Sequence, residues 1–166
     1  DHDSLTGLHN RRSFNRKAQL RLRQSRRDKV PMVLLVCDID HFKAFNDGYG
    51  HQQGDHALRQ LGRVIGQAAR RPLDLAVRMG GEEFAVLLYD MSREQALAHA
   101  EGLRLAVLEL EIAHARSDTA AALSISIGLA CTSPAAVESL EQLYESADKA
   151  LYRAKAAGRN QVMPWI

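Results

Sequence analysis

The sequence predicts an α/β fold: a single domain with a central mixed sheet of about five strands surrounded by helices. Three observations support this prediction. The 166 residues, 46% of them hydrophobic, suffice for one domain with a substantial core. Apolar runs typical of strands alternate with longer segments whose apolar residues recur at helical spacing. In mid-chain, two apolar segments meet at Gly80-Gly81, which predicts a tight β-hairpin because glycine reaches positive φ without steric cost.

Composition and charge exclude several classes of protein. The net charge of +2 is too small to indicate a nucleic acid or an anionic membrane as partner. No stretch approaches the roughly 20 apolar residues of a membrane helix. Cys37 and Cys131 each lie in an apolar run, which favours reduced core cysteines in a cytoplasmic protein over a disulfide. Because helix-like sequence follows Asp1 almost at once, we expect residues 1–166 to be one domain of a larger protein, which could itself be membrane-anchored.

The first third of the chain predicts a helix, a strand and a second helix. Asn10 suits an N-cap, and a basic helix follows to about Arg27. Its Arg and Lys residues suit a solvated face, with phosphate or partner binding as the alternative. The continuous apolar run at 32–37 is typical of a central strand buried on both faces. A polar loop or short helix at 41–47 and a helix at roughly 52–70 come next.

The hairpin and a third helix occupy the middle of the chain. The hairpin strands are predicted at 75–77 and 85–89. Ser92, with Gln95 three residues later, forms a capping box for a helix that runs to about residue 111. A loop follows.

The last part of the chain predicts two strands flanking a fourth helix. Large apolar residues alternate with small ones at 123–129, which indicates a strand with one face that is solvent-exposed or lined by small residues. Ser139 and Gln142 form another capping box, and Gly158 ends that helix. A short final strand is expected at 161–165.

Three carboxylates are candidate metal ligands. Asp38 directly follows the central strand, where ligands gather in open α/β sheets, although a turn or cap role is the alternative. Glu82 and Glu83 lie just past the hairpin tip, where they either decorate a solvated turn or hold a metal. If the hairpin pairs with the central strand, the three carboxylates meet and repel one another unless a cation is present. Oxygen-only ligands suit Mg²⁺ or Mn²⁺.

Five further side chains suit nucleotide binding. Lys43 adds positive charge to a loop whose N–H groups can cradle phosphate. Asn46 and Asp55 flank a glycine-rich bend and together could read a guanine edge, with helix capping as the alternative for each. Lys155 and Arg159 suit either phosphate contacts or a favourable position at a helix C-terminus.

Five motifs in order make the chain resemble the GGDEF domain of the diguanylate cyclase family. They are DSLTGLHNRR at 3–12, DIDHFKAFND at 38–47, GHQQGD at 50–55, GGEEF at 80–84, and the closing run ADKALY at 147–152 with KAAGRN at 155–160. Each motif alone is moderately specific, but the five at family spacing are very specific and cover nearly the whole chain. The resemblance implies a palm-like nucleotidyl cyclase fold.

The resemblance implies a nucleotidyltransferase that condenses two GTP molecules into cyclic di-GMP and two pyrophosphates. Each protomer of an antiparallel homodimer would hold one GTP, and each 3′-hydroxyl would attack the other α-phosphate. An upstream sensor or dimerisation module would bring the protomers together. A catalytically silent cyclic di-GMP receptor and a GTP-binding regulatory module are the alternatives.

The resemblance also assigns roles to residues. Asp38, the Ile39 carbonyl, Glu82 and Glu83 would hold two Mg²⁺ ions per half-site, with Mn²⁺ as the alternative. Glu82 and Glu83 would be catalytic, whether as general base or as metal ligands, and Lys43 would stabilise transition-state charge. Substrate contacts would come from Phe42, Asn46, His51, Asp55, Gly80, Gly81, Lys155 and Arg159.

An RxxD motif precedes the hairpin. Arg71 and Asp74, with Arg78, match an allosteric site at which the product cyclic di-GMP inhibits the enzyme; a surface ion pair is the alternative. Some family members add an arginine on the following helix. This chain has Gly102 near that position and Arg104 close by.

Overall fold

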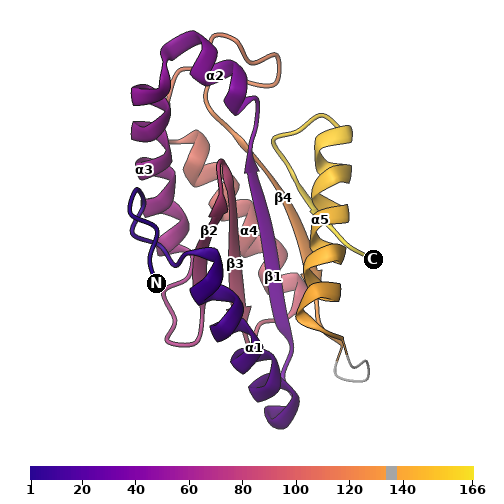
Figure 1. Cartoon of the computed structure of the whole chain (residues 1–166). Coiled ribbons are helices and arrows are strands. Elements are labelled where there is room, and N and C mark those ends of the chain that lie inside the picture. Colours follow the sequence, from indigo (N-terminus) through magenta and orange to yellow (C-terminus); the bar gives the residue numbers. More distant parts are fainter. Residues whose placement is uncertain (134–137) are drawn as a thin grey trace.

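A five-stranded mixed sheet with strand order β2-β3-β1-β4-β5 forms the centre of the computed structural model, which describes residues 1–133 and 138–166 (Figure 1). The strands are β1 (Met32–Ile39), β2 (Leu75–Gly80), β3 (Glu83–Tyr89), β4 (Ile125–Cys131) and β5 (Val162–Pro164). β5 pairs parallel with β4, and the other pairs are antiparallel. The predicted α/β class, hairpin and central strand are confirmed.

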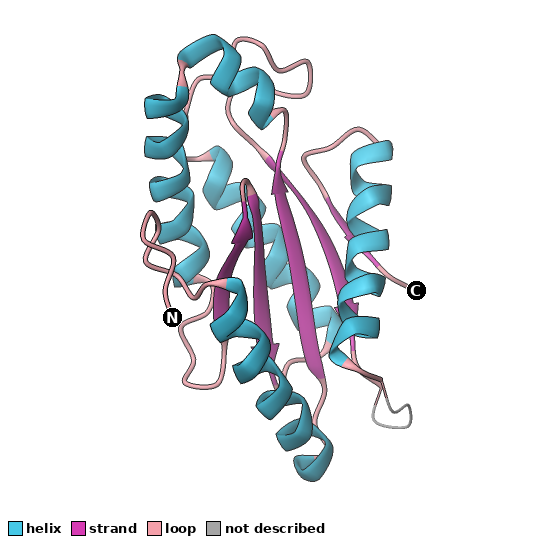
Figure 2. Ribbon diagram, in the orientation of Figure 1, coloured by secondary structure: helices cyan, strands magenta, loops and turns pink. Residues whose placement is uncertain are grey.

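Helices cover both faces of this sheet (Figure 2). They are α1 (Arg11–Asp28), α2 (Phe42–Tyr49), α3 (His51–Gln67), α4 (Arg93–Leu108) and α5 (Leu140–Ala156). One buried cluster joins Leu35 of β1 to residues of α2, α3 and α4. The other joins Leu34, the preceding residue of β1, to α1 and α5. Successive strand side chains therefore enter different cores, which explains the continuous apolar run of β1.

The predicted helix caps are present. The Asn10 side chain accepts a hydrogen bond from Ser13 N at 2.9 Å. Ser92 and Ser139 both form complete capping boxes. Gly158 follows the last helix with a φ of 122°, in the region that favours glycine. The sequence therefore located the starts of three helices correctly.

Some boundaries differ from the predictions. The polar segment after β1 is helical as far as Tyr49, and α3 ends at Gln67 rather than near residue 70. β4 begins at Ile125 because its pairing with β1 begins at Ile39, the last residue of that strand. All but the last residue of β4 are buried, so its face of small residues is buried rather than solvent-exposed.

Both cysteines are free, and Cys37 is fully buried. Burial raises the pKa of the Cys37 thiol, which keeps the side chain protonated within the core. Across residues 1–133 and 138–166, no helix combines the length and apolar character needed to cross a bilayer.

Candidate active site

The tip of the β2–β3 hairpin lies beside the end of β1. Asp38 is paired with Glu83 across the sheet, and Ile39 N donates a hydrogen bond to Glu82 O at 3.3 Å. Gly80 and Gly81 adopt φ values of 151° and 55°. A Cβ at either position would meet open space, so the backbone conformation is what requires glycine. The prediction that the hairpin pairs with the central strand and carries its acids there is confirmed.

Glu82 and Glu83 have different surroundings. The Tyr144 hydroxyl of α5 donates a hydrogen bond to Glu83 Oε1. Burial, reinforced by this bond and the charge of Glu83, raises the pKa of Tyr144, so its hydroxyl stays a donor. Glu82 instead borders a cavity on the α2–α3 side. The two glutamates therefore face different helices, as their adjacent positions at a strand end predict.

Asp38 lies in a half-buried position beneath α5. Lys155 Nζ donates to its Oδ2 at 2.8 Å. Burial raises the pKa of Asp38, the contact with Lys155 opposes that rise, and the charges of Glu82 and Glu83 reinforce it. In the described parts of the chain, no three His, Cys, Asp or Glu side chains are grouped as a metal site. Asp38 and Glu83 are adjacent but are held by Lys155 and Tyr144.

A cavity of about 430 Å³ opens between the hairpin tip, α2 and α3. Its lining residues are Phe42, Lys43, Asn46, Asp47, His51, Asp55, Leu58, Arg78, Gly81 and Glu82. Asn46 Oδ1 is buried and makes no hydrogen bond. A Cβ on Gly54 would lie 1.9 Å from that oxygen, so only glycine leaves room for it. Most of the predicted substrate-binding residues therefore border one cavity, and one of them, Asn46, has a buried oxygen without a hydrogen-bond partner.

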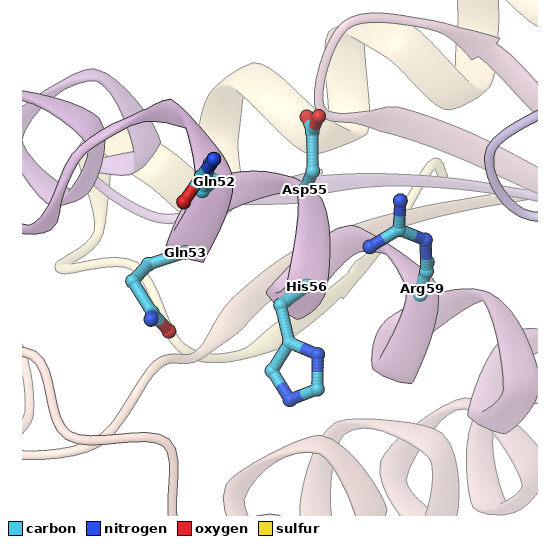
Figure 3. Close-up of a pocket in the computed structure, with 5 residues that line it drawn as sticks. All are labelled: Gln52, Gln53, Asp55, His56 and Arg59. Atoms are coloured by element: carbon cyan, nitrogen blue, oxygen red, sulfur yellow. The ribbon is translucent and has the colours of Figure 1, made fainter.

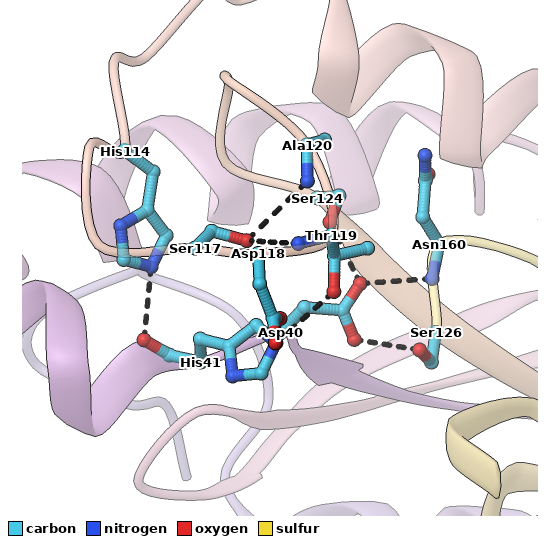
Figure 4. Close-up of polar contacts among 10 residues, drawn as sticks. All are labelled: Asp40, His41, His114, Ser117, Asp118, Thr119, Ala120, Ser124, Ser126 and Asn160. Atoms are coloured by element: carbon cyan, nitrogen blue, oxygen red, sulfur yellow. Dashed lines mark hydrogen bonds and ion pairs between the residues drawn. The ribbon is translucent and has the colours of Figure 1, made fainter. Parts of the chain in front are cut away.

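The loop before β4 holds the start of α2 in place. His41, which caps α2 in a left-handed conformation with φ 53°, contacts Thr119 Oγ1 and Asp118 Oδ1, each at 3.0 Å. His114 Nε2 lies 2.9 Å from the carbonyl of His41 (Figure 4). At the other end of α2, Ala115 N donates to the Tyr49 hydroxyl. These contacts fix the helix that carries Lys43 and Asn46.

Asp55 also borders a second, more open depression on α3, of about 500 Å³. The other lining residues are Gln52, Gln53, His56 and Arg59 (Figure 3). Asp55 and His56 point in opposite directions there. Asp55 is the one residue common to this depression and to the hairpin cavity.

Arg71 and Asp74 form a preassembled pair at the opposite end of the hairpin. Asp74 is buried and accepts hydrogen bonds from Arg71 Nε, Arg71 NH2 and Tyr89 N, all at 3.0 Å. The Arg71 side chain is nevertheless 46% exposed. The pair is therefore rigid on the Asp74 side and open to solvent on the Arg71 side.

Arg78 lies away from that pair. Its Nε donates to Gly81 O at 2.9 Å, and its NH1 lies 3.3 Å from Asp3 Oδ1. Arg71 contacts Tyr89, and the seven residues of β3 separate the two ends by about 20 Å. Arg78 therefore braces the hairpin tip, and the structure does not bring it to Arg71 and Asp74 as the sequence led us to expect.

The end of α5 contributes two residues that the sequence indicated and one contact that it did not. Lys155 pairs with Asp38, and Arg159 lies in the turn after the helix, with φ 63°. In that turn, Asn160 Oδ1 accepts from Arg104 NH1 at 2.9 Å. Arg104 also pairs with Glu101, so its guanidinium is already engaged.

Sequence reasoning gave no role to Tyr144 or Asp40. Tyr144 lies beside the apolar stripe of α5, and nothing in its spacing indicates a contact with Glu83. Asp40 had a usable signal: it follows Asp38 by two residues, so the alternation of β1 places both on the same side.

Comparison with known proteins agrees with this arrangement. The family model described as "Diguanylate cyclase, GGDEF domain" matches residues 1–161. The chain belongs to this family. It is 40% identical over 161 residues to the probable diguanylate cyclase DgcT of Escherichia coli K12, covering 97% of this chain and 35% of DgcT. The first curated relatives are all longer, and the chain spans between 35% and 50% of their lengths.

Solved GGDEF structures share the fold. The GGDEF domain of DgcB from Caulobacter crescentus, in complex with c-di-GMP, superposes with a TM-score of 0.88 at 36% identity, covering 98% of this chain and 92% of that one. The active GGEEF domain of a diguanylate cyclase from Vibrio cholerae gives a TM-score of 0.83 at 27% identity, covering 95% and 97%. The GGEEF form of the motif thus occurs in a domain described as active.

Proposed function

We propose that this chain is a catalytic domain that condenses two GTP molecules into cyclic di-GMP. The 3′-hydroxyl of each GTP gives up its proton to a base, for which Glu82 is the candidate, and its oxygen forms a bond to the α-phosphorus of the other. The bond from that phosphorus to the bridging oxygen breaks, and pyrophosphate leaves. The observation that carries the proposal is the cavity lined by Lys43, Asn46, Asp55 and Glu82, with Asp38 and Glu83 beside it. Cationic, base-reading and acidic groups therefore meet at one end of the sheet.

Guanine recognition is assigned to Asn46 and Asp55. Asn46 lines the cavity, and its Oδ1 is buried against Gly54 without a hydrogen-bond partner. Its amide group can donate to N3 of guanine. Asp55 accepts from N1–H and the 2-amino group. An adenine base, which lacks that amino group, would leave these acceptors unsatisfied.

The acidic residues suit divalent cations. Asp38, Glu82, Glu83 and the Ile39 carbonyl supply only oxygen ligands, which Mg²⁺ prefers, and Mn²⁺ would also be accepted. Burial, reinforced by the charges of Glu82 and Glu83, raises the pKa of Asp38, and the Lys155 ammonium opposes that rise. These residues would hold two ions, which when bound would neutralise triphosphate charge and lower the pKa of the attacking hydroxyl. Lys155 would then leave Asp38 for the phosphates.

The remaining groups orient the triphosphate. Gly80 and Gly81 leave the hairpin backbone bare, so a nucleotide can approach it closely. Lys43 is exposed beside the cavity and would stabilise charge on the α-phosphate in the transition state. Phe42 and His51 line the same cavity, while Lys155 and Arg159 would contact the outer phosphates.

Turnover requires two protomers, because one chain holds a single GTP and the product is two-fold symmetric. We assign this role to an antiparallel homodimer whose facing sites place each hydroxyl near the other α-phosphate. A sensor or dimerisation segment in the parent protein would raise the effective concentration of one domain near the other.

The test is to incubate GTP and Mg²⁺ with the chain fused to a dimeric coiled coil. Cyclic di-GMP and pyrophosphate are expected in a ratio of one to two, quantified by chromatography and a phosphate assay. GTP binding without pyrophosphate release would instead identify a regulatory module. Binding of cyclic di-GMP alone would identify a silent receptor.

Replacing Arg71 by alanine is expected to weaken inhibition by cyclic di-GMP. The exposed guanidinium beside the buried Asp74 can fork to a phosphate or a guanine edge, so its loss should raise the inhibitory concentration by about tenfold or more. Initial rates at increasing cyclic di-GMP would measure this. Arg63→Ala, which removes a cation from the exposed face of α3, is the control. Unchanged inhibition in Arg71→Ala would remove the proposed site.

A further inference from the structure

The carboxylate of Asp40 is buried at the end of β1, with 2% of the residue exposed. Its Oδ2 accepts from Ser124 Oγ at 2.7 Å and from Asn160 N at 3.0 Å, and its Oδ1 accepts from Ser126 Oγ at 2.6 Å (Figure 4). The Asp40 backbone N donates to Ser124 O at 2.9 Å. One carboxylate therefore joins the end of β1 to β4 and to the turn that follows α5.

That turn is strained. Arg159 and Asn160 both adopt left-handed conformations, with φ values of 63° and 46°, directly after Gly158 at 122°. Residues with a Cβ rarely adopt this conformation and need surrounding contacts to hold them there. Asn160 has two such contacts, its backbone N–H to Asp40 and its side chain to Arg104. Arg159 N itself donates to Ala154 O at 3.0 Å, so the anchored Asn160 holds the chain on the other side of Arg159.

Asp38 and Asp40 lie two residues apart, so both point to the α5 side of the sheet. Asp38 contacts Lys155 near the end of α5, and Asp40 contacts the turn one step further along. The end of β1 therefore carries the candidate metal ligand Asp38 and also contacts the segment that bears the two cations Lys155 and Arg159.

We propose that Asp40 is a positioning residue that holds the turn at 158–160, so that Arg159 faces the outer phosphates of bound GTP. The inference rests on the proposed function, since it concerns the same nucleotide site. Asp40 does not touch the nucleotide; it acts through Asn160 and Arg159. A carboxylate suits this task because it accepts from a backbone N–H and two hydroxyls at once.

The experiment measures binding of a GTP analogue with a methylene bridge between the α- and β-phosphates, with GMP as the short ligand, by calorimetry in Mg²⁺. Asp40→Ala is expected to weaken binding of the analogue by about tenfold and binding of GMP by less than about twofold. Ser126→Ala is the matched control: it removes one hydrogen bond from the same carboxylate but leaves Asn160 held. It should bind the analogue within about twofold of the unaltered chain.

A double-mutant cycle separates positioning from general stability. In an Arg159→Ala background, Asp40→Ala is expected to cause no further loss of analogue affinity, because the residue it positions is gone. Equal losses in both backgrounds, or equal losses for the analogue and GMP, would overturn the proposal. Asp40→Asn keeps the side-chain volume and supplies the same cycle if the alanine variant does not fold. Failure of the unaltered chain to bind the analogue would refute the proposed function instead.

Discussion

Replacing Asp38 or Glu83 by alanine is expected to lower cyclic di-GMP formation by at least about a thousandfold. These adjacent carboxylates come from paired strands, and each substitution removes one metal ligand from the proposed site. The fold should survive, because burial, with a smaller contribution from the charges of Glu82 and Glu83, raises the pKa of Asp38, so its ionised carboxylate is not favoured in this position. Initial rates with saturating GTP and Mg²⁺, in the coiled-coil fusion, would measure the effect.

The control for this pair is Glu145→Ala. Glu145 is 65% exposed on α5 and pairs with Lys149, so its removal changes the net charge equally without touching the site. Its rate should stay within about twofold of the unaltered chain, as expected for a surface ion pair. An Asp38 or Glu83 variant with full activity would refute the metal-binding role of that residue.

Gly128→Ala is expected to destabilise the fold by at least about 3 kcal/mol. A Cβ on this residue of β4 would lie 2.1 Å from Ala147 O and 2.3 Å from Leu151 N. Both are backbone atoms of α5, so no side-chain rotation can relieve the clash, and the whole helix must move. Because α5 carries Tyr144 and Lys155, activity should fall along with stability. Urea unfolding followed by circular dichroism would measure the free energy of unfolding.

Gly102→Ala provides the contrast. This glycine lies inside α4, and a Cβ there would meet nothing within 4 Å. The substitution should raise stability by about 0.5–1 kcal/mol, the usual helical preference for alanine over glycine. If Gly128→Ala instead unfolded at the same urea concentration as the unaltered chain, the close approach of α5 to β4 would be contradicted.

Much of the fold was predictable from local sequence. The capping boxes at Ser92 and Ser139 and the hairpin at Gly80-Gly81 each depend on residues only a few positions apart. Such contacts form between near neighbours whatever the rest of the chain does. The boundaries that shifted depend on distant partners. β4 begins at Ile125 because that residue pairs with Ile39 of β1, which lies 86 positions earlier in the chain.

The candidate site divides in the same way. Its residues were predicted from the sequence motifs. The hairpin pairs with β1 and places Glu83 beside Asp38, as predicted. The partners of those residues were not predictable: Tyr144 reaches Glu83 across 61 positions, and Lys155 reaches Asp38 across 117. Arg78, expected beside Arg71 and Asp74, braces the hairpin tip instead.

Local sequence patterns were enough to predict which segments become helices and strands, where three helices begin, and which acids, amides and cations are available for nucleotide chemistry. The contact of Asp40 with Asn160 N and the close approach of Gly128 to the backbone of α5 appear only in the folded structure. Local structure depends on φ, ψ and hydrogen bonds within a few residues. Contacts between elements depend on strand register and on close packing between helix and sheet, and no single segment encodes either of these alone.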